Sequence, residues 1–258
     1  MKRISLYFLV LISLASCGTS SHEHAENIHM RNTMATVYMQ QAPEYVALVQ
    51  QAYNQAKVVL DEKMILATRP VAIVTDIDET VLNNSPYEAK QILENFSYPD
   101  HWDEWINKEE AQPIPGSLAF LQHADSLGVA IFYISNRKVH LLNATINNLK
   151  KFGYPQADSS HIYLRTTTNS KEDRRNKVLG QGYEIALFLG DNLDDMAAQF
   201  ETGDVESRAN AVKENLNNFG SKYIVLPNPS YGKWAQNRGF YNPKLNQDSL
   251  ASEYLNGF

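Results

Sequence analysis

The residues best suited to chemistry in this sequence are two aspartates one residue apart, Asp76 and Asp78. They follow directly on the apolar, β-branched run 71–75, which predicts a buried parallel strand. Side chains at i and i+2 of an extended chain point to the same side, so the carboxylates would repel unless a cation separates them or one is protonated. One aspartate could then be a metal ligand and nucleophile, and its neighbour a general acid and base. The pair could instead form an Asx-type turn that ends the strand.

A second acidic group follows another apolar run further along the chain. The run 185–189 predicts a buried strand, and Gly190, Asp191 and Asp195 come after it. We expect Gly190 to let the backbone turn tightly at the strand end. Ligands of an open parallel sheet bind outside the carboxyl ends of its strands, so these acids should face Asp76. Oxygen ligands gathered on neighbouring strand ends favour a hard divalent cation, which predicts a magnesium site.

Polar residues also follow two other predicted strands. Ser135 and Asn136 come after the run 129–134, where a hydroxyl and backbone N–H groups could bind a phosphate oxygen. A serine at this place could equally cap the next helix. Lys171 follows the short strand predicted at 161–164, and by itself it is typical of a solvated side chain. Its basic neighbours are interpreted as surface charges; they are Arg174 and Arg175.

The elements around these positions alternate between strands and helices. Apolar residues at three- and four-residue spacings predict helix over 28–66, which Pro43 should divide in two or open. Three more helices and a last strand are predicted, at 117–127, 138–152 and 201–218 for the helices and at 223–226 for the strand. The alternation predicts an α/β fold, a parallel sheet with Rossmann-like winding.

The predicted organisation is one domain, residues 28–258, with a smaller helical portion that caps the strand ends. The division of this domain is a helical portion at 28–68 with an insert at 85–112, an α/β core at 70–84 and 113–228, and a C-terminal tail at 229–258.

The first 17 residues are typical of an export signal. Lys2 and Arg3 precede the apolar run 4–14, which is too short to span a bilayer, and the chain continues into Leu14-Ala15-Ser16-Cys17. This string resembles a bacterial lipobox, and Cys17 is the one cysteine of the sequence. We therefore expect Cys17 to carry lipid that anchors an exported protein to the cell envelope, at the outer membrane, through a tether at 18–27. An ordinary secretory peptide is the alternative.

Charge and length restrict the partners. The 258 residues carry a formal net charge of −6. A protein that binds a nucleic-acid polymer needs a basic surface, so this class of partner is not expected.

The string D-I-D-E-T-V-L-N-N, from Asp76 to Asn84, resembles the first motif of the haloacid dehalogenase superfamily of aspartate-nucleophile phosphatases. Glu79, Asn84 and Tyr87 resemble the bacterial class C acid phosphatases in particular. The resemblance covers nearly the whole chain.

Later motifs follow in the order that this resemblance requires. Ser135 stands at the position of the superfamily's second motif, and Lys171 lies within S-K-E-D-R at the position of the third. G-D-N-L-x-D, which begins at Gly190, resembles the second class C signature. The family has Phe after the last Asp where this chain has Met196, so a local change in packing is expected.

The resemblance implies a haloacid dehalogenase-like core and hydrolysis of phosphomonoesters with Mg²⁺, as in a class C acid phosphatase or 5′-nucleotidase. Asp76 would form an aspartyl-phosphate, and Asp78 would act as general acid and then base. The metal ligands would be Asp76, the backbone carbonyl of Asp78, Asp191, and Asp195 either directly or through water. The phosphoryl oxygens would be bound by Ser135, Asn136 and Lys171.

The same resemblance implies 5′-nucleotides as substrates, nicotinamide mononucleotide among them. Their bases would stack on Trp102 and Tyr231, because stacking tolerates any base. Trp102, Trp105, Tyr231 and Trp234 could instead be packed inside the protein. The expected partners are a small phosphomonoester and, through Cys17, a membrane; a homodimer is left open.

Two alternatives remain. A phosphotransferase or phosphonatase could use the same scaffold. A non-catalytic surface lipoprotein that binds a ligand such as haem is the alternative from another class, although the sequence offers no obvious pair of haem ligands.

Overall fold

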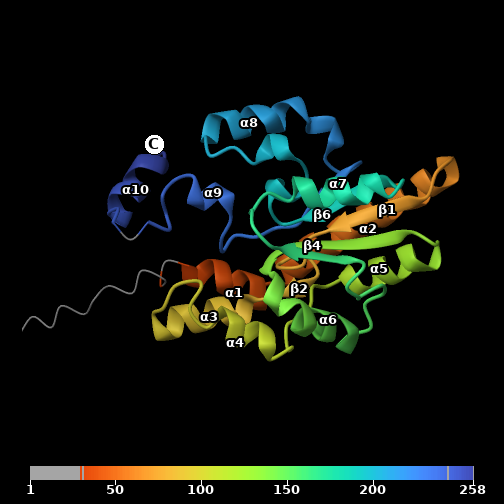
Figure 1. Ribbon diagram of the computed structural model, residues 1–258. Helices are drawn as coiled ribbons and strands as arrows, with labels where there is room; N and C mark the ends of the chain where they lie inside the picture. Colours follow the sequence, from red (N-terminus) through yellow and green to blue (C-terminus); the bar gives the residue numbers. More distant parts are fainter. Residues whose placement is uncertain (1–29, 31, 243, 258) are drawn as a thin grey trace, which may run out of the picture.

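The computed structural model describes residues 30, 32–242 and 244–257 (Figure 1). The predictions made for the signal segment 1–17, for Cys17 and for the tether 18–27 lie outside the described residues. Within the described ranges, no helix is both long enough and apolar enough to cross a membrane.

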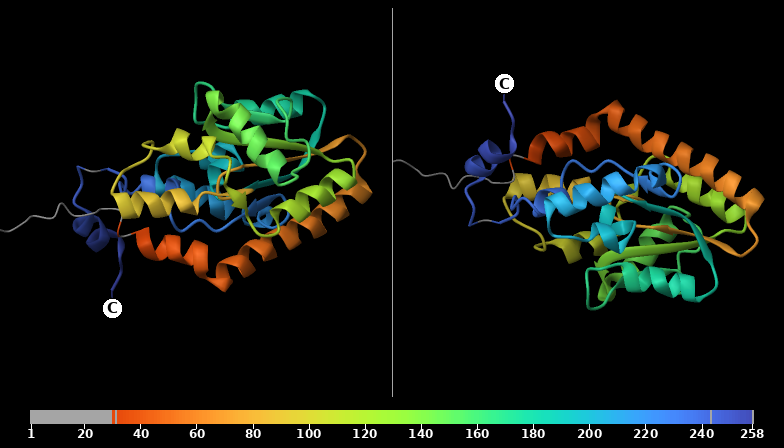
Figure 2. Two further views of the ribbon diagram at one scale, coloured as in Figure 1. Left: turned by 90° about the horizontal axis from the view of Figure 1, so that it is seen from below. Right: turned by 90° about the horizontal axis from the view of Figure 1, so that it is seen from above.

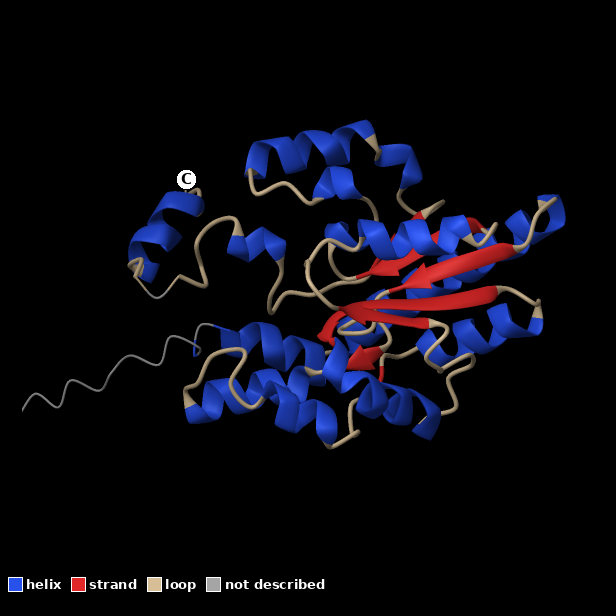
Figure 3. Ribbon diagram, viewed as in Figure 1, coloured by secondary structure: helices blue, strands red, loops and turns tan. Residues whose placement is uncertain are grey.

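Five parallel strands form the central sheet, in the order β5-β4-β1-β6-β7 (Figure 3). The strands are β1 Val71–Thr75, β4 Ala130–Lys138, β5 Ile162–Arg165, β6 Glu184–Gly190 and β7 Tyr223–Val225. All five residues of β1 are buried, as expected for a central strand covered on both faces. The predicted α/β fold with a parallel sheet is confirmed.

Helices cover both faces of this sheet. Val71 and Ile73 of β1 belong to an apolar cluster with α2, α5 and α6, whereas Ala72 and Val74 belong to one with α7 and α8. Successive side chains of a strand point to opposite faces, which explains the alternation. Figure 1 shows α7 and α8 above the sheet and α5 and α6 below it. The helices are α2 Pro43–Leu66, α5 Ser117–Ser126, α6 Leu142–Lys151, α7 Glu172–Gly180 and α8 Val205–Glu214.

The remaining helices lie beyond the carboxyl ends of the strands (Figures 1 and 3). They are α1 Thr33–Gln41, α3 Ser85–Glu94, α4 Trp102–Asn107, α9 Lys233–Gln236 and α10 Gln247–Tyr254. A two-stranded antiparallel pair joins the insert to the core; it consists of β2 Leu82–Asn83 and β3 Gln112–Pro113. Short 3-10 turns complete the described part, at Val139–Leu141, Leu193–Asp195, Ala198–Phe200 and Leu216–Asn218.

The N-terminal helices behave partly as predicted. Pro43 is the first residue of α2, where its missing N–H costs no helical hydrogen bond, so the chain bends between α1 and α2. Figure 2 shows α1 and α2 following one another along one side of the molecule, with α5 beside α2. Helix α2 packs on the sheet instead of capping the strand ends. The division of the chain into a helical portion and a core stays a prediction.

Candidate active site

The end of β1 places Asp76 at the carboxyl edge of the sheet. Its backbone N–H donates to the carbonyl of Leu189 at 2.9 Å, which ties the loop after β1 to the end of β6. Its buried carboxylate accepts a hydrogen bond from Nζ of Lys171, and the same ammonium lies 2.7 Å from Oδ1 of Asp195. One buried lysine thus pairs with acids from two strand ends that are more than 100 positions apart in sequence.

Three carboxylates gather at this edge. One oxygen each from Asp76, Asp191 and Asp195 lies within 4.8 Å of the others. The donor set is oxygen only and mostly buried, which suits a hard divalent cation such as Mg²⁺ that keeps several waters. The sequence-based prediction that these acids meet is therefore confirmed.

The electrostatics of the cluster follow from its burial. Burial raises the pKa of Asp76 to about 7; Asp195 and Asp78 act in the same direction, and Lys171 opposes them. Burial, together with Asp195 and Asp76, raises the pKa of Asp191 well above its usual value. Burial would lower the pKa of Lys171, but Asp195 and Asp76 outweigh it and the pKa is raised. Without a cation the ionised cluster is therefore costly, and a bound cation would stabilise it.

Asp78 has different partners from Asp76. Its Oδ1 accepts from Nε and Nη2 of Arg137 at 2.9 and 2.8 Å and from Nδ2 of Asn84 at 2.8 Å. Its Oδ2 accepts from Oγ of Ser135 at 3.0 Å. Strand β1 ends at Thr75, and the two carboxylates that follow it have different cationic partners: Asp76 pairs with Lys171, and Asp78 with Arg137.

The predicted phosphate-binding residues lie at the same edge but have protein partners. Ser135 is fully buried, and its Oγ also accepts from the backbone N–H of Arg137 at 3.1 Å. Oδ1 of Asn136 accepts from Nη2 of Arg174 at 2.6 Å. Their role toward phosphate stays a prediction, and so does that of Lys171.

The interpretation of Arg174 and Arg175 as surface charges was wrong, because both side chains are buried. Nη1 of Arg174 donates to the carbonyl of Ser135 at 2.6 Å, and Nη2 donates to the carbonyl of Ser170 at 2.9 Å. Arg175 pairs with Glu172 and Glu201 and donates to the backbone behind the acidic cluster. The two arginines brace β4 at Ser135 and the 3-10 turn that carries Asp195.

Glycine is required at position 190 for a reason other than the predicted one. Gly190 is not among the described glycines with a positive φ, so the turn does not require its conformational freedom. A Cβ at this position would lie 2.5 Å from Cβ and 2.8 Å from Cγ of Asp195. Glycine is therefore required because the Asp195 side chain crosses directly over the backbone.

The aromatic residues divide into buried and accessible ones. Trp102 is only 8% exposed and packs edge-on against Tyr87, with ring centroids 4.9 Å apart. Its ring is largely covered by Tyr87, and its contact with a substrate base stays a prediction. Trp105 is partly buried, and its Nε1 donates to Oδ1 of Asn84 at 2.8 Å. Trp234 is 46% exposed.

The C-terminal loop is fastened to the site. Tyr231 donates its hydroxyl hydrogen bond to the buried carboxyl of Glu79, three residues after the nucleophile candidate Asp76. Nδ2 of Asn228 donates to Oδ2 of Asp191 at 2.7 Å. Tyr231 therefore lies next to the acidic edge, and its contact with a substrate stays a prediction.

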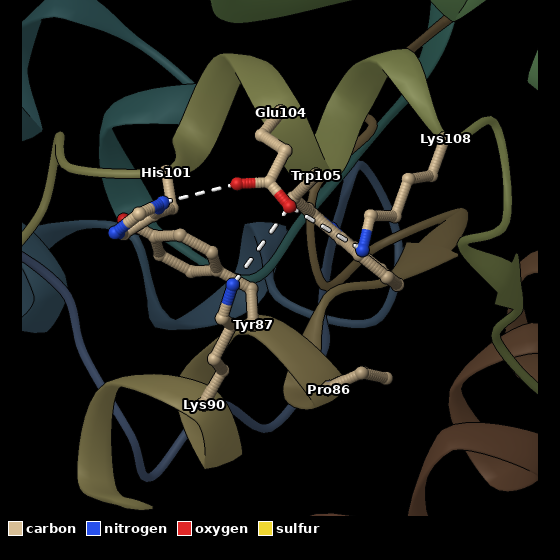
Figure 4. Close-up of a pocket in the computed structure, with 7 residues that line it drawn as sticks. All are labelled: Pro86, Tyr87, Lys90, His101, Glu104, Trp105 and Lys108. Carbon is tan, nitrogen blue, oxygen red and sulfur yellow. Dashed lines mark hydrogen bonds and ion pairs between the residues drawn. The ribbon is translucent and has the colours of Figure 1, made fainter. Parts of the chain in front are cut away.

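A hollow of about 160 Å³ lies between α3 and α4 (Figure 4). Figure 4 shows the carboxylate of Glu104 reaching toward His101, Lys90 and Lys108 across it. Trp105 forms part of its wall, and through Asn84 it connects this hollow to Asp78.

Comparisons with known proteins agree with this geometry. The sequence profile of the family described as "HAD superfamily, subfamily IIIB (Acid phosphatase)" matches residues 12–234. The structure is similar to that of the class C acid phosphatase from Bacillus anthracis, with a TM-score of 0.84 and 41% identity over 90% of this chain and 100% of that chain. A structure of that enzyme with tungstate bound gives a TM-score of 0.85 at the same identity and coverage.

Plant proteins are similar over shorter stretches. A soybean stem 31 kDa glycoprotein is 31% identical over 162 residues, which are 60% of this chain and 57% of the relative. Acid phosphatase 1 of tomato is 28% identical over 48% of this chain and 51% of the relative. The chain spans about half the length of the curated relatives it matches. The family profile nevertheless extends over most of the sequence, and the family predicted from the motifs is confirmed: this chain belongs to the acid phosphatase family of haloacid dehalogenase (HAD) superfamily subfamily IIIB.

Proposed function

We propose that this protein is a metal-dependent phosphomonoesterase that works through an aspartyl-phosphate on Asp76. The observation that carries the proposal is the meeting of Asp76, Asp191 and Asp195 with Lys171 at the carboxyl edge of the sheet. A cluster of acids can hold a divalent cation, and a buried lysine beside it can hold the phosphoryl group of a substrate. The acid phosphatase family supports this reaction class.

The metal of the proposal is Mg²⁺. Its ligands would be Asp76, Asp191, the backbone carbonyl of Asp78, and Asp195 either directly or through water. The fit rests on the donor set, which contains oxygen atoms alone and lies within 4.8 Å. When bound, the ion would neutralise charge on the phosphate and orient it for in-line attack.

The reaction would proceed in two steps. In the first, an oxygen of Asp76 forms a bond to phosphorus while the bond to the leaving oxygen breaks, and Asp78 gives its proton to that oxygen. In the second, Asp78 takes a proton from water, whose oxygen attacks phosphorus and releases inorganic phosphate and the Asp76 carboxylate. Splitting the reaction in this way replaces one difficult step by two easier ones.

Lys171, Ser135 and Asn136 would hold the phosphoryl oxygens. Lys171 already compensates charge on Asp76, and the hydroxyl of Ser135 donates to Oδ2 of Asp78. The B. anthracis enzyme has been solved with tungstate, a tetrahedral oxyanion like phosphate, which supports an oxyanion site in this fold.

The proposed substrates are 5′-nucleotides, including nicotinamide mononucleotide. Tyr231 lies beside the acidic edge and could offer its ring to a base, while Trp102 is covered by Tyr87. A panel of monophosphates tests this part of the proposal. If sugar phosphates and nucleotides are hydrolysed with equal kcat and KM, stacking on aromatic rings does not determine the substrate.

We also propose that the protein is lipid-anchored at Cys17 on the outer membrane of the cell envelope. The support is the order of the charged, apolar and small residues before Cys17. Replacement of this residue, Cys17→Ala, should move the protein from the membrane fraction to the soluble fraction. Whether the protein pairs as a homodimer is tested by light scattering of the soluble form.

A non-catalytic role is the second candidate. Three of the plant relatives are named stem glycoproteins and another a vegetative storage protein, so the family includes proteins whose names state no enzymatic activity. A protein with that role would have no need of the Asp76–Asp191–Asp195 cluster.

The deciding experiment measures phosphate release from a 5′-nucleotide by the protein without residues 1–17. It compares Mg²⁺, a chelator, and the variant Asp76→Asn. Metal-dependent release that the variant abolishes is the expected result. A folded protein that binds Mg²⁺ and releases no phosphate from any monophosphate would overturn the hydrolase proposal and favour the non-catalytic role.

A further inference from the structure

Arg137 is a large side chain that is fully buried at the centre of the site. Arg137 lies on β4, but its guanidinium reaches the loop after β1 and donates to Asp78, 59 positions earlier in the sequence. Burial of an arginine is expensive unless its charge is paired and its N–H groups are bonded. The cost indicates that the pairing serves a purpose beyond the packing of β4.

Two N–H groups of Arg137 converge on one carboxylate oxygen of Asp78, and one of them also reaches the other oxygen. Nε and Nη2 of Arg137 both approach Oδ1 of Asp78, at 2.9 and 2.8 Å, and Nε also approaches Oδ2 at 3.3 Å. Nη1 donates to Oγ1 of Thr145 on α6 at 3.2 Å, which fixes the plane of the guanidinium from the other side. The backbone N–H of Arg137 also donates to Oγ of Ser135.

The other donors to Asp78 are single and neutral. Asn84 donates one N–H to Oδ1, and Ser135 donates one hydroxyl to Oδ2. Either bond leaves the carboxylate free to rotate about it. A planar guanidinium that donates two N–H groups to Oδ1 and also reaches Oδ2 at 3.3 Å restricts that freedom, which a lysine ammonium would not do in the same way.

We propose that Arg137 is a positioning residue that fixes the orientation of the Asp78 carboxylate for proton transfer to the leaving group. The inference rests on the proposed function, in which Asp78 gives a proton to the leaving oxygen. It predicts that Arg137 matters for that transfer and not for the attack by Asp76, because Asp76 pairs with Lys171 instead.

Dependence of the rate on the leaving group separates these two roles. When the P–O bond breaks, the proton of Asp78 moves to the leaving oxygen and yields a neutral alcohol or phenol. A poor leaving group such as the alkoxide of a 5′-nucleotide needs this proton, and p-nitrophenolate leaves without it. Well-placed general acids contribute about 10²- to 10⁴-fold, so misplacement of Asp78 should affect the two substrates unequally.

The experiment compares kcat/KM of the wild-type protein and Arg137→Met for a 5′-nucleotide, phenyl phosphate and p-nitrophenyl phosphate, at saturating Mg²⁺. The expected loss is about 10²-fold or more for the nucleotide and less than about 10-fold for p-nitrophenyl phosphate, with phenyl phosphate between them. Equal losses for all three substrates would overturn the inference.

A matched control is Arg174→Met, which removes another buried arginine beside Ser135 that makes no described bond to Asp78. Its losses should be the same for the three substrates. In the background of Asp78→Asn, Arg137→Met should add no further dependence on the leaving group, because the residue acts through Asp78. An added dependence in that background would contradict the inference.

Folding is checked by thermal unfolding of every variant. If Arg137→Met does not fold, Arg137→Lys and Thr145→Val carry the same test, since the first loses the planar fork and the second loses its anchor on α6. In both variants the loss of kcat/KM should again be largest for the 5′-nucleotide, but the difference between the substrates should be smaller than in Arg137→Met. The failure of the proposed function is a different result, because the wild-type protein would then release no phosphate from any of the three substrates.

Discussion

Because Asp195 approaches Gly190 closely, the single methyl group added by Gly190→Ala tests the role of Asp195 in the metal site. In Gly190→Ala the new Cβ would lie 2.5 Å from Cβ and 2.8 Å from Cγ of Asp195, well inside van der Waals contact. The backbone of Gly190 is held by β6, whose neighbours β1 and β7 pair with it on both sides. The Asp195 side chain must therefore move, and with it one of the three carboxylates that would hold the cation.

The magnitude follows from two effects. Forcing one methyl group into a packed place costs about 1–3 kcal/mol of stability. Displacing Asp195 also breaks its 2.7 Å contact with Lys171 and its 3.0 Å bond from the backbone N–H of Asn192. Loss of groups that orient a metal ligand typically weakens metal affinity about 10- to 100-fold, and we expect the Mg²⁺ affinity of Gly190→Ala to fall by that factor.

The assay is a titration of phosphatase activity with Mg²⁺, together with thermal unfolding in chelator. The control is Gly180→Ala in α7, where a new Cβ meets nothing within 4 Å and alanine favours the helix. Its Mg²⁺ titration should match that of the wild-type protein. An unchanged Mg²⁺ affinity in Gly190→Ala would refute the assignment of Asp195 to the metal site.

Three other predictions follow from the electrostatics of the site. The pKa of Asp76 is about 7 in the folded metal-free protein and 3.8 in the reference state, so the folded state holds an extra proton between these values. The free energy of unfolding in chelator should therefore fall as the pH rises from about 4 to 7, by up to roughly 1.4 kcal/mol per pH unit. In Asp76→Asn this dependence on pH should be smaller, as measured by urea unfolding at several pH values in this range. Lys171→Met leaves two buried acids without their cation and should cost about 3–5 kcal/mol in chelator at pH 8 by urea unfolding; an unchanged midpoint would contradict the pairing. Tyr231→Phe leaves the buried carboxyl of Glu79 without one donor and should cost about 1–3 kcal/mol by the same measurement, whereas no change would mean that the loop is held elsewhere.

Much of the fold follows from local patterns. The strand at 71–75 and the strand at 185–189 are continuous apolar runs, and strands of that kind are buried on both faces of a parallel sheet. Pro43 marks the start of α2 because of its own covalent structure. The meeting of Asp76, Asp191 and Asp195 follows from the topology, since the carboxyl ends of neighbouring parallel strands share one edge.

The details of the site could not be predicted in this way. The burial of Arg137, Arg174 and Arg175 depends on partners that lie far away in sequence, and a charged side chain carries no local sign of whether it will find them. Trp102 is covered by Tyr87, a contact between two helices whose crossing no spacing rule determines.

Gly190 is a case in which the residue was predicted to matter for a reason that the structure corrects. A glycine at a strand end is typical of a turn with positive φ, but this one makes room for a side chain five positions later. Sequence patterns can identify such a position, and the three-dimensional contact is needed to explain it.

The central claim is that Asp76 is the nucleophile, and trapping of the intermediate tests it most directly. The protein would be mixed with a 5′-nucleotide and Mg²⁺, quenched in acid within milliseconds, digested, and its peptides analysed by mass spectrometry. The account predicts one phosphoryl group on Asp76 during turnover and none in Asp76→Asn or in chelator. Turnover with no phosphoryl group on Asp76 at any quench time would contradict the account, and so would its absence in Asp78→Asn with p-nitrophenyl phosphate, which needs no proton in the first step and whose second step is slowed.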